Sequence, residues 1–358
     1  MERDTLSFRQ LMALFWGGLL GPAAQLLPGE AGQAGVVGAL GIMAAGVLTA
    51  VGGWAFFRLA RGCGGVARGI LVRLGPVWGK ALLSIYIVWG GLLLTVRLRA
   101  GAQRLVGSGQ RDGAVWFFLI VLGSMALWMA RGELGALGRA GELMFAALAL
   151  VGGAVLLLGL FQVRGEHLLT RWEWSIPNAL RAAWPGIGVF GYGLFAAFLI
   201  QPEERKGAVR HWCGWLWVGC LVLGVAQTIL LGCFGARLTQ QLDSPFFQLA
   251  KSVGIEGGFQ RLESVVAAIW SFSDLILLGT ILWGMGSTAR RVVPCLSRQA
   301  AVAVAALLAM VTALALFGER LPMSAVTEVW VPVGNVVLGT AVPVILAALP
   351  KKAGETGS

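Results

Sequence analysis

Residues Phe15 to Gly29 read FWGGLLGPAAQLLPG and are the most informative part of the sequence for the fold. It is apolar enough to enter a membrane, yet it contains glycines and two prolines, which weaken or interrupt a helix. A bilayer offers no water to satisfy freed backbone groups, so interrupted helices occur there only where the backbone lines a cavity or packs on protein. The stretch therefore predicts a membrane protein whose first span is opened.

A second interrupted stretch lies in the other half of the chain, where residues 184–193 read WPGIGVFGYG. Matching Gly/Pro interruptions in two halves indicate a binding site at the midplane of an inverted-repeat transporter. We expect a first repeat over about 8–163 and a second over about 183–349, with helices 1 and 6 broken. The alternative is that these glycines only allow close helix packing, as the pattern Gly17-x-x-x-Gly21 does in many membrane bundles.

The composition agrees with a membrane location, because 57% of the 358 residues are hydrophobic and only 13% are charged. Soluble domains carry about 25% charged residues, so lipid must cover much of this surface. Windows of about 20 apolar residues define transmembrane helices. They predict an all-α integral membrane protein with ten spans at about 8–27, 33–57, 77–96, 114–130, 143–163, 183–200, 212–236, 265–286, 300–317 and 329–349.

The net charge of +11 is explained by topology. With both termini in the cytoplasm, 17 of the 28 Lys and Arg residues fall on the inner side, where such residues orient a membrane protein and meet anionic lipid. The outer connection that holds Arg97, Arg99, Arg104 and Arg111 runs against this bias. We expect a lipid bilayer as partner and no nucleic acid.

A short amphipathic helix is predicted over 244–253, in the outer connection after the seventh span. Ser244 suits an N-cap and Pro245 suits the first helical position. One face then carries the apolar residues Phe246, Leu249, Ala250 and Val253, and the helix is expected to end at Gly254, Gly257 and Gly258. Such a helix lies on the membrane or caps the bundle.

The two interruptions also predict what the protein binds. An opened helix frees N–H groups that suit a carboxylate and C=O groups that suit an ammonium group or a cation. A zwitterionic amino acid offers both charges. The ligand-binding residues expected at the interruptions and on the eighth span are Gly17, Gly18, Gly21, Pro22, Ala23, Gly188, Gly191, Tyr192, Ser271 and Asp274.

Asp274 is predicted to be the single ionisable residue well inside a span, and Ser271 shares its helix face. Burying a lone carboxylate in a bilayer is costly, so Asp274 should face the bundle interior or a hydrated path. It would serve as an ammonium partner, a cation ligand or a proton carrier. A purely structural role, bonded to opened backbone or to a neighbouring helix, stays open.

Motifs of soluble enzymes and of metal sites are absent from the sequence. The chain contains no H-E-x-x-H, no G-x-S-x-G and no P-loop. The stretch 186–191 does match G-x-G-x-x-G, but no strand precedes it and it lies in an apolar span. We therefore expect no enzymatic activity, no metal and no cofactor, with Na⁺ or H⁺ coupling an open question.

Short motifs resemble those of one family. Residues 27–33, LPGEAGQ, resemble the L-P-G-x-x-G-Q signature that closes the first span of endospore germination permeases of the GerAB type. Residues 244–249, SPFFQL, followed by FQRLE at 259–263 and by Trp270, look like that family's outer segment leading into the eighth span. The ten-span layout is similar over nearly the whole chain.

This family is similar in turn to the amino acid–polyamine–organocation transporters. The resemblance implies a five-plus-five inverted repeat and a small germinant, often an amino acid, bound near the midplane. It implies the spore inner membrane, or the cell membrane, as location and two other receptor subunits as partners, a larger membrane protein and a lipoprotein. It places Gly21, Pro22 and Ala23 at the first break and Gly188, Gly191 and Tyr192 near the second, while Asp274 departs from the family's pattern.

Two functions follow from these observations. The first is a germinant-receptor subunit that binds a small amino acid and signals germination by a shift between two arrangements of the bundle. The second is an ion-coupled secondary amino acid transporter, for which Asp274 would be a coupling site.

Overall fold

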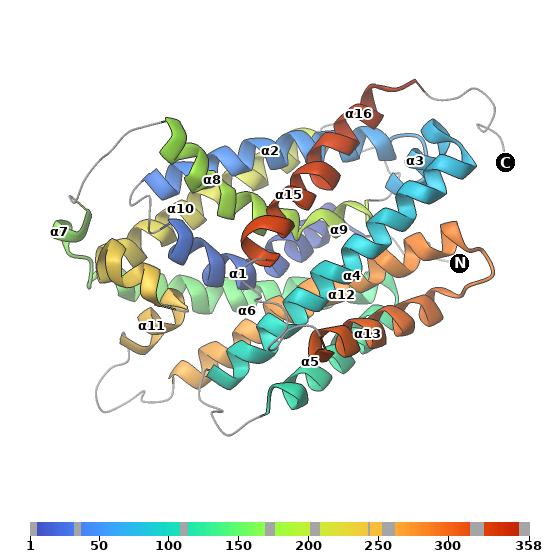
Figure 1. Ribbon diagram of the computed structural model, residues 1–358. Coiled ribbons are helices and arrows are strands. Elements are labelled where there is room, and N and C mark those ends of the chain that lie inside the picture. The colour runs from blue at the N-terminus through green and yellow to red at the C-terminus, as the bar shows by residue number, and fades with distance from the viewer. Residues whose placement is uncertain are drawn as a thin grey trace.

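The computed structural model describes residues 6–31, 37–107, 114–168, 176–200, 208–242, 244–252, 262–315 and 326–350. Within these ranges the chain is helical and contains no strand (Figure 1). The helices are α1 Phe8–Ala31, α2 Val37–Ala60, α3 Val66–Leu74, α4 Pro76–Gly107, α5 Val115–Arg131, α6 Leu134–Leu160, α7 Gly165–Leu168, α8 Ile176–Gly191, α9 Leu194–Ala197, α10 Ala208–Gln241, α11 Pro245–Ser252, α12 Leu262–Val292, α13 Arg298–Ala315, the π-helical η2 Val326–Trp330, α15 Val331–Val336, the π-helical η3 Val337–Ala341 and α16 Val342–Ala348.

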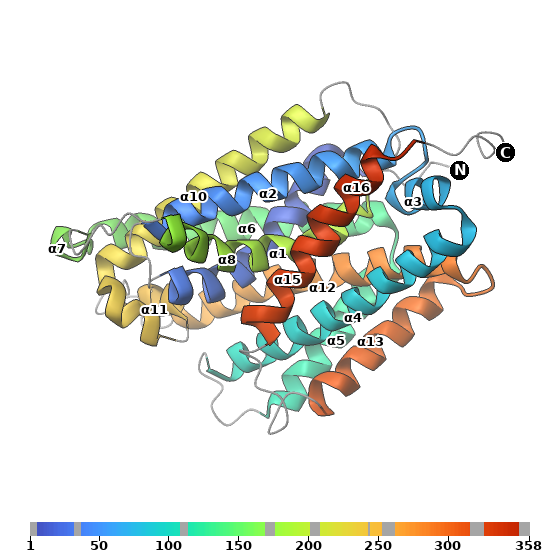
Figure 2. The same ribbon diagram turned by 45° about the horizontal axis from the view of Figure 1, so that its top comes forward.

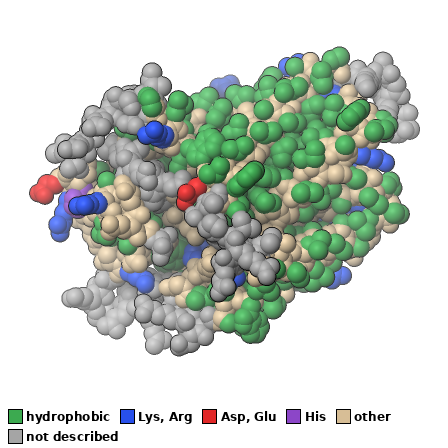
Figure 3. All heavy atoms as spheres, in the orientation of Figure 1, with side chains coloured by type: hydrophobic (Ala, Val, Ile, Leu, Met, Phe, Trp, Pro, Cys, Tyr) green, Lys and Arg blue, Asp and Glu red, His purple; other side chains and the backbone are tan. Residues whose placement is uncertain are grey.

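Each of the ten predicted spans corresponds to helix, which confirms the all-α membrane architecture. Eight helical segments of the described chain are long and apolar enough to cross a membrane, and the 17-residue α5 is a shorter apolar helix. The remaining span is the pair α8 and α9, which the chain enters at Ile176 and leaves after Ala197. Hydrophobic side chains cover most of the face shown in Figure 3, as lipid contact requires.

Two groups of helices enclose α1. One group contains α2, α8 and α10, and the other contains α4, α5, α12 and α13. Helix α1 contacts α8 and α10 on one side and α6 and α12 on the other. In α1 and α12, 72% of the residues in the most apolar window are buried, against 17% in α6. Helix α1 therefore lies in the interior, and the second half of α8, residues 185–190, is mostly buried beside it.

The ends of the bundle are marked by its short helices. Helices α7 and α11 lie at one end and α3 lies at the opposite end in both views (Figures 1 and 2). Helix α11 covers the end of the bundle, since Phe246 and Phe247 are buried against Trp270 of α12, with ring centroids 4.4 and 5.9 Å away. Of the predicted helix, Val253 and the glycines 254, 257 and 258 lie outside the described residues.

Helix α4 differs from its predicted span, which ended at residue 96. It continues to Gly107 because nothing between Val96 and Gly107 breaks a helix and its apolar face continues. Arg97 and Arg104 therefore lie in a transmembrane helix, where they are 1% and 7% exposed. The expectation that Asp274 would be the single ionisable residue inside a span is wrong, and Arg99, also predicted to lie in the connection, belongs to the same helix.

Helix α10 is kinked close to where its span was predicted to end and continues to Gln241. At Gly235 the backbone adopts φ 73° and ψ 159°, a conformation that glycine reaches readily and other residues avoid. The helix is thereby kinked one residue before the predicted boundary at 236. The motif residues at 32–33 and 259–261, which contributed to the family resemblance, lie outside the described residues.

Candidate functional site

The prediction that the first span is broken is wrong, because α1 runs as one helix from Phe8 to Ala31, and what remains of the interruption is a side-chain contact to its backbone. The hydroxyl of Ser273, on α12, donates to the carbonyl of Gly17 at 2.6 Å and accepts from the amide N–H of Gly21 at 2.6 Å. These two backbone groups pair with each other in a regular α-helix. Pro22 has no N–H to offer the carbonyl of Gly18, and that carbonyl lies 3.3 Å from the same hydroxyl. The Ser273 side chain thus inserts into the backbone hydrogen bonding of α1 next to Pro22, where one helical hydrogen bond is already missing.

Glycine is required at this contact because α12 approaches closely. A Cβ atom at Gly21 would lie 2.9 Å from the Ser273 hydroxyl and 3.3 Å from Asp274 Oδ1. Gly17 and Gly18 face Ile276 and Leu277 in the same way. Gly17 and Gly18 therefore serve close helix packing. Gly21 also allows close packing, but its neighbours are the polar side chains of Ser273 and Asp274.

The second interruption separates α8 from α9. The N–H of Tyr192 donates to the carbonyl of Val189, and the N–H of Gly193 donates to the carbonyl of Phe190. The carbonyl of Gly188 therefore lacks the donor that a regular α-helix would supply. Asn335 of α15 replaces that donor through its Nδ2, at 3.0 Å, and its Oδ1 accepts from Trp89 Nε1 at 3.1 Å. The sixth span is thus broken as predicted, and an amide from the tenth span satisfies the break.

A buried cluster of charges lies between α1 and the α8–α9 break. Arg97 of α4 donates to Asp274 Oδ1 at 3.1 Å, and Arg104 of α4 forms an ion pair with Asp274 Oδ2. Arg97 also reaches Gln25 of α1 at 3.4 Å. Gly101 allows this approach, because a Cβ there would lie 3.0 Å from Asp274 Oδ2. We call Arg97, Arg104 and Asp274 the charged centre.

The charged centre carries a surplus of positive charge. It contains two guanidinium groups and one carboxylate, and Asp274 is the single acid with which these arginines form ion pairs among the described side chains. An uncompensated charge in a low-dielectric interior is strongly unfavourable. The centre is therefore complementary to a further anionic group.

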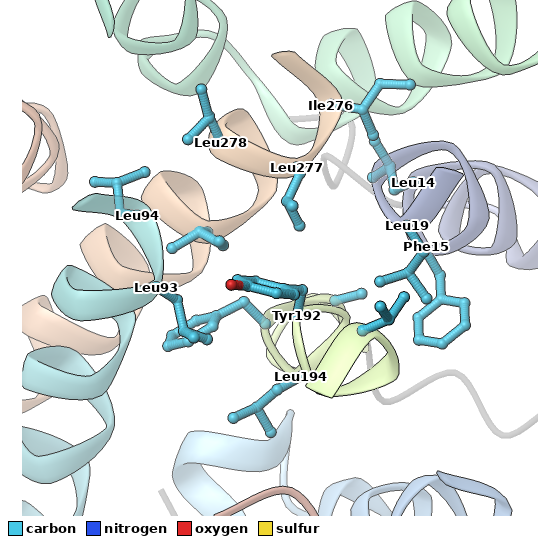
Figure 4. Close-up of a cluster of buried hydrophobic side chains, with 14 of the residues drawn as sticks. Leu14, Phe15, Leu19, Leu93, Leu94, Tyr192, Leu194, Ile276, Leu277 and Leu278 are labelled. Carbon is cyan, nitrogen blue, oxygen red and sulfur yellow. The ribbon is translucent and has the colours of Figure 1, made fainter. Parts of the chain in front are cut away.

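Tyr192 connects the charged centre to the second interruption. Its ring lies beneath the guanidinium of Arg97, with 5.5 Å between Arg97 Cζ and the ring centroid, a cation–π distance. Figure 4 shows the ring between Leu93 of α4 and Leu19 of α1. The tyrosine is 1% exposed, and its hydroxyl has no hydrogen-bond partner within the described ranges. It is a polar group available to a ligand.

Three of the residues predicted from sequence meet around Arg97, namely Gly21, Tyr192 and Asp274. Gly188 and Gly191 lie against the tenth span, and Gly191 lines a small cavity of about 70 Å³ together with Phe15 and Asn335. Ser271 instead bonds to the carbonyl of Ala267 on its own helix at 3.2 Å. Ala23 lines a separate apolar cavity, and Pro22 is buried beside Gly21.

Four side chains of the candidate site were not predicted from the sequence: Arg97, Arg104, Ser273 and Asn335. Arg97 and Arg104 are seven residues apart on the face that carries Leu93 and Gly101, so the helical period was a usable signal. Asn335 is a lone amide inside an apolar run, which is a costly residue without a partner. Ser273 gave no comparable signal, because Ser271 was an equally good choice one turn from Asp274.

Replacing Ser273 with alanine should destabilise the protein by about 1–3 kcal/mol, because the change leaves two buried backbone groups of α1 without their side-chain partner. Ser271→Ala is the matched control, since that half-buried hydroxyl contacts its own helix. Thermal unfolding in detergent compares the two. Equal unfolding temperatures for both variants would argue against the bridge.

Comparison with known proteins supports the fold. No protein family model matches the chain, and neither does a curated protein. The crystal structure of MhsT in complex with L-phenylalanine is similar to it, with a TM-score of 0.69 and 15% sequence identity, over 96% of this chain and 88% of MhsT. At that identity the similarity establishes the fold. The chain shares the all-α fold of MhsT.

Proposed function

We propose that this chain binds a small amino acid at the charged centre and passes the binding event on as the membrane subunit of a spore germinant receptor. The observation that carries the proposal is the surplus positive charge of Arg97, Arg104 and Asp274 between α1 and the α8–α9 break. A ligand carboxylate would neutralise that surplus. The ligand ammonium group would pair with Asp274 or with the carbonyls of Gly17 and Gly18.

The ion pair itself supplies a mechanism for signalling. Without ligand, Arg97 and Asp274 hold α4 against α12. A zwitterion that inserts between them offers each residue a new partner of opposite charge, so the two helices lose a direct link without leaving a charge unpaired. A ligand that binds the separated arrangement better shifts the population towards it. Gly21 and Tyr192 would contact the ligand from α1 and from the α8–α9 break.

The receptor assignment rests on the family resemblance of the sequence motifs. It predicts a spore inner-membrane location and two partner subunits, a larger membrane protein and a lipoprotein. Deletion of the gene should abolish the response of spores to one germinant, and the genes for both partners should lie beside it. A spore that germinates normally with every germinant after the deletion would contradict the receptor role.

Arg104→Gln tests the ligand chemistry most directly. It removes the surplus charge and leaves the Arg97–Asp274 pair intact, so the variant should fold at least as well as the wild type. A thermal-shift screen of the purified wild-type protein against a panel of amino acids identifies the ligand, because binding to the folded state raises its unfolding temperature. Arg104→Gln should lower the affinity for that ligand at least about tenfold, as expected for the loss of one charge-assisted hydrogen bond.

Arg99→Gln is the control, because Arg99 lies on the same helix but forms no ion pair with Asp274. It should retain wild-type affinity. The proposal fails if Arg104→Gln and Arg99→Gln bind the identified amino acid equally well, or if no amino acid shifts the unfolding temperature of the wild type.

The alternative function is an ion-coupled secondary amino acid transporter, which the fold shared with MhsT favours. In that case Na⁺ or H⁺ would have to bind near Asp274, whose two oxygens already face guanidinium groups. Purified protein in liposomes distinguishes the two functions. Accumulation of labelled amino acid down an imposed ion gradient would favour the transporter, and binding without accumulation would favour the receptor.

A further inference from the structure

A second and larger cavity lies on the opposite side of α1 from the charged centre. It has a volume of about 260 Å³ and is enclosed by α1, α6, α10 and α12, with Phe246 of α11 at one edge. A dry apolar cavity of about 150 Å³ is already large enough to bind benzene. Neither Arg97 nor Arg104 lines it, so it is distinct from the proposed amino acid site.

Three buried side chains with polar atoms line this largely apolar cavity. Trp16, Gln227 and Trp270 are 4%, 2% and 3% exposed. The indole N–H of both tryptophans and both amide atoms of Gln227 have no hydrogen-bond partner in the described part of the chain. Buried polar groups are normally paired, so three such residues on one cavity indicate an occupant that supplies the partners. Three of the four groups are donors, so the occupant must present acceptor oxygens.

The rim of the cavity indicates how the occupant enters. Ala149 of α6 and Val218 and Val222 of α10 line the cavity and are exposed on the apolar outer surface. No charged side chain of the described residues lines the cavity. A charged ligand would therefore meet no counter-ion, whereas a neutral apolar molecule could pass directly from the lipid phase.

We propose that this cavity is a second binding site, for a neutral lipophilic molecule with ester or carbonyl oxygens that enters from the bilayer. Its acceptor oxygens would bond to Gln227 and to the two indoles, and its apolar body would pack on Ala23 and Leu27 of α1. The site adjoins the Ser273 bridge, because Trp16 precedes Gly17 and Trp270 lies one turn before Ser273. The same chemistry occurs in a phospholipid acyl ester and in a free fatty ester.

Glycines provide the test variants. A Cβ at Gly153 of α6, which lines the cavity, meets nothing within 4 Å, so Gly153→Leu should fill the cavity without a clash. Gly214 of α10 is equally open but does not line this cavity, so Gly214→Leu is the matched control. Ala149→Leu at the rim is a second filling variant if Gly153→Leu is poorly folded.

Bromine quenches tryptophan fluorescence at short range, so the indoles of Trp16 and Trp270 can report occupancy. The full chain is reconstituted in nanodiscs, and the methyl ester of dibromostearic acid is added. We expect saturable quenching in the wild type and in Gly214→Leu, and loss of the saturable part in Gly153→Leu. Gln227→Leu should require about fivefold more probe, the loss expected for one hydrogen bond.

A second arm replaces the host lipid with dibrominated phosphatidylcholine. Stronger quenching of the wild type than of Gly153→Leu in this arm would identify a phospholipid chain as the occupant. A difference confined to the methyl ester would identify a free lipophile. Quenching that rises linearly with probe and is the same in wild type and Gly153→Leu in both arms would overturn the proposal.

Discussion

Asp274→Asn is expected to lower the free energy of unfolding by about 3–5 kcal/mol, the range for breaking a buried ion pair by removing one partner. The substitution keeps the shape of the side chain but leaves Arg97 and Arg104 as two uncompensated charges in the bundle interior. Chemical or thermal unfolding of the purified protein in detergent measures the change.

Glu142→Gln is the matched control for this prediction. Glu142 pairs with Arg9, but the Arg9 side chain is 81% exposed, so the pair should contribute no more than about 1 kcal/mol. Replacing all three members of the charged centre with leucine should recover much of the stability lost in Asp274→Asn, because apolar packing often substitutes for a buried ion pair. Similar stabilities for Asp274→Asn and Glu142→Gln would show that the charged centre does not hold the bundle together.

Gly191→Leu is expected to have the second-largest effect. A Cβ at Gly191 would lie 2.1 Å from Cγ and Nδ2 of Asn335, so any side chain there displaces the amide that satisfies the Gly188 carbonyl. Overpacking of this kind costs about 1–3 kcal/mol, and the unpaired carbonyl adds about 1–3 kcal/mol. Ligand response should be lost as well, because the α8–α9 break is no longer held in place.

A double-mutant cycle with smaller changes separates this contact from general strain. Gly191→Ala should be destabilising in the wild type but nearly neutral in an Asn335→Gly background, where both the clashing amide and the Asn335 Cβ, 2.2 Å from the added methyl group, are gone. Gly339→Ala is the control, since a Cβ at Gly339 meets nothing within 4 Å. Additive effects of Gly191→Ala and Asn335→Gly would contradict the proposed contact.

The fold was predictable because it depends on features that a local window can read. Apolar stretches of membrane length and the Gly/Pro clusters at 17–22 and 185–193 specify helices and the break in the sixth span. These features need no knowledge of which helices are neighbours.

The candidate site was only partly predictable, because its partners come from distant helices. Asp274 was identified as a costly buried charge, but its partner Arg97 lies 177 residues away and was assigned to a loop. A charged residue ends an apolar window even when the helix continues. The window therefore assigned Arg97 to a loop, although it lies within α4. The role of Ser273 depends on which face of α12 meets Gly21, and spacing within α12 alone does not specify that.

The spacing of buried residues in the last span, Val326–Ala348, also departs from a regular helical period. Its buried residues recur at helical spacing, some as adjacent pairs, but two gaps of five positions separate Val326 from Val331 and Leu338 from Pro343. These steps coincide with the π turns η2 and η3, each of which accommodates one residue more than an α turn. An added residue rotates everything after it by about 100°. Each π turn absorbs that rotation, so deleting one residue within η3 should give an α turn and leave the buried side of α16 facing the bundle.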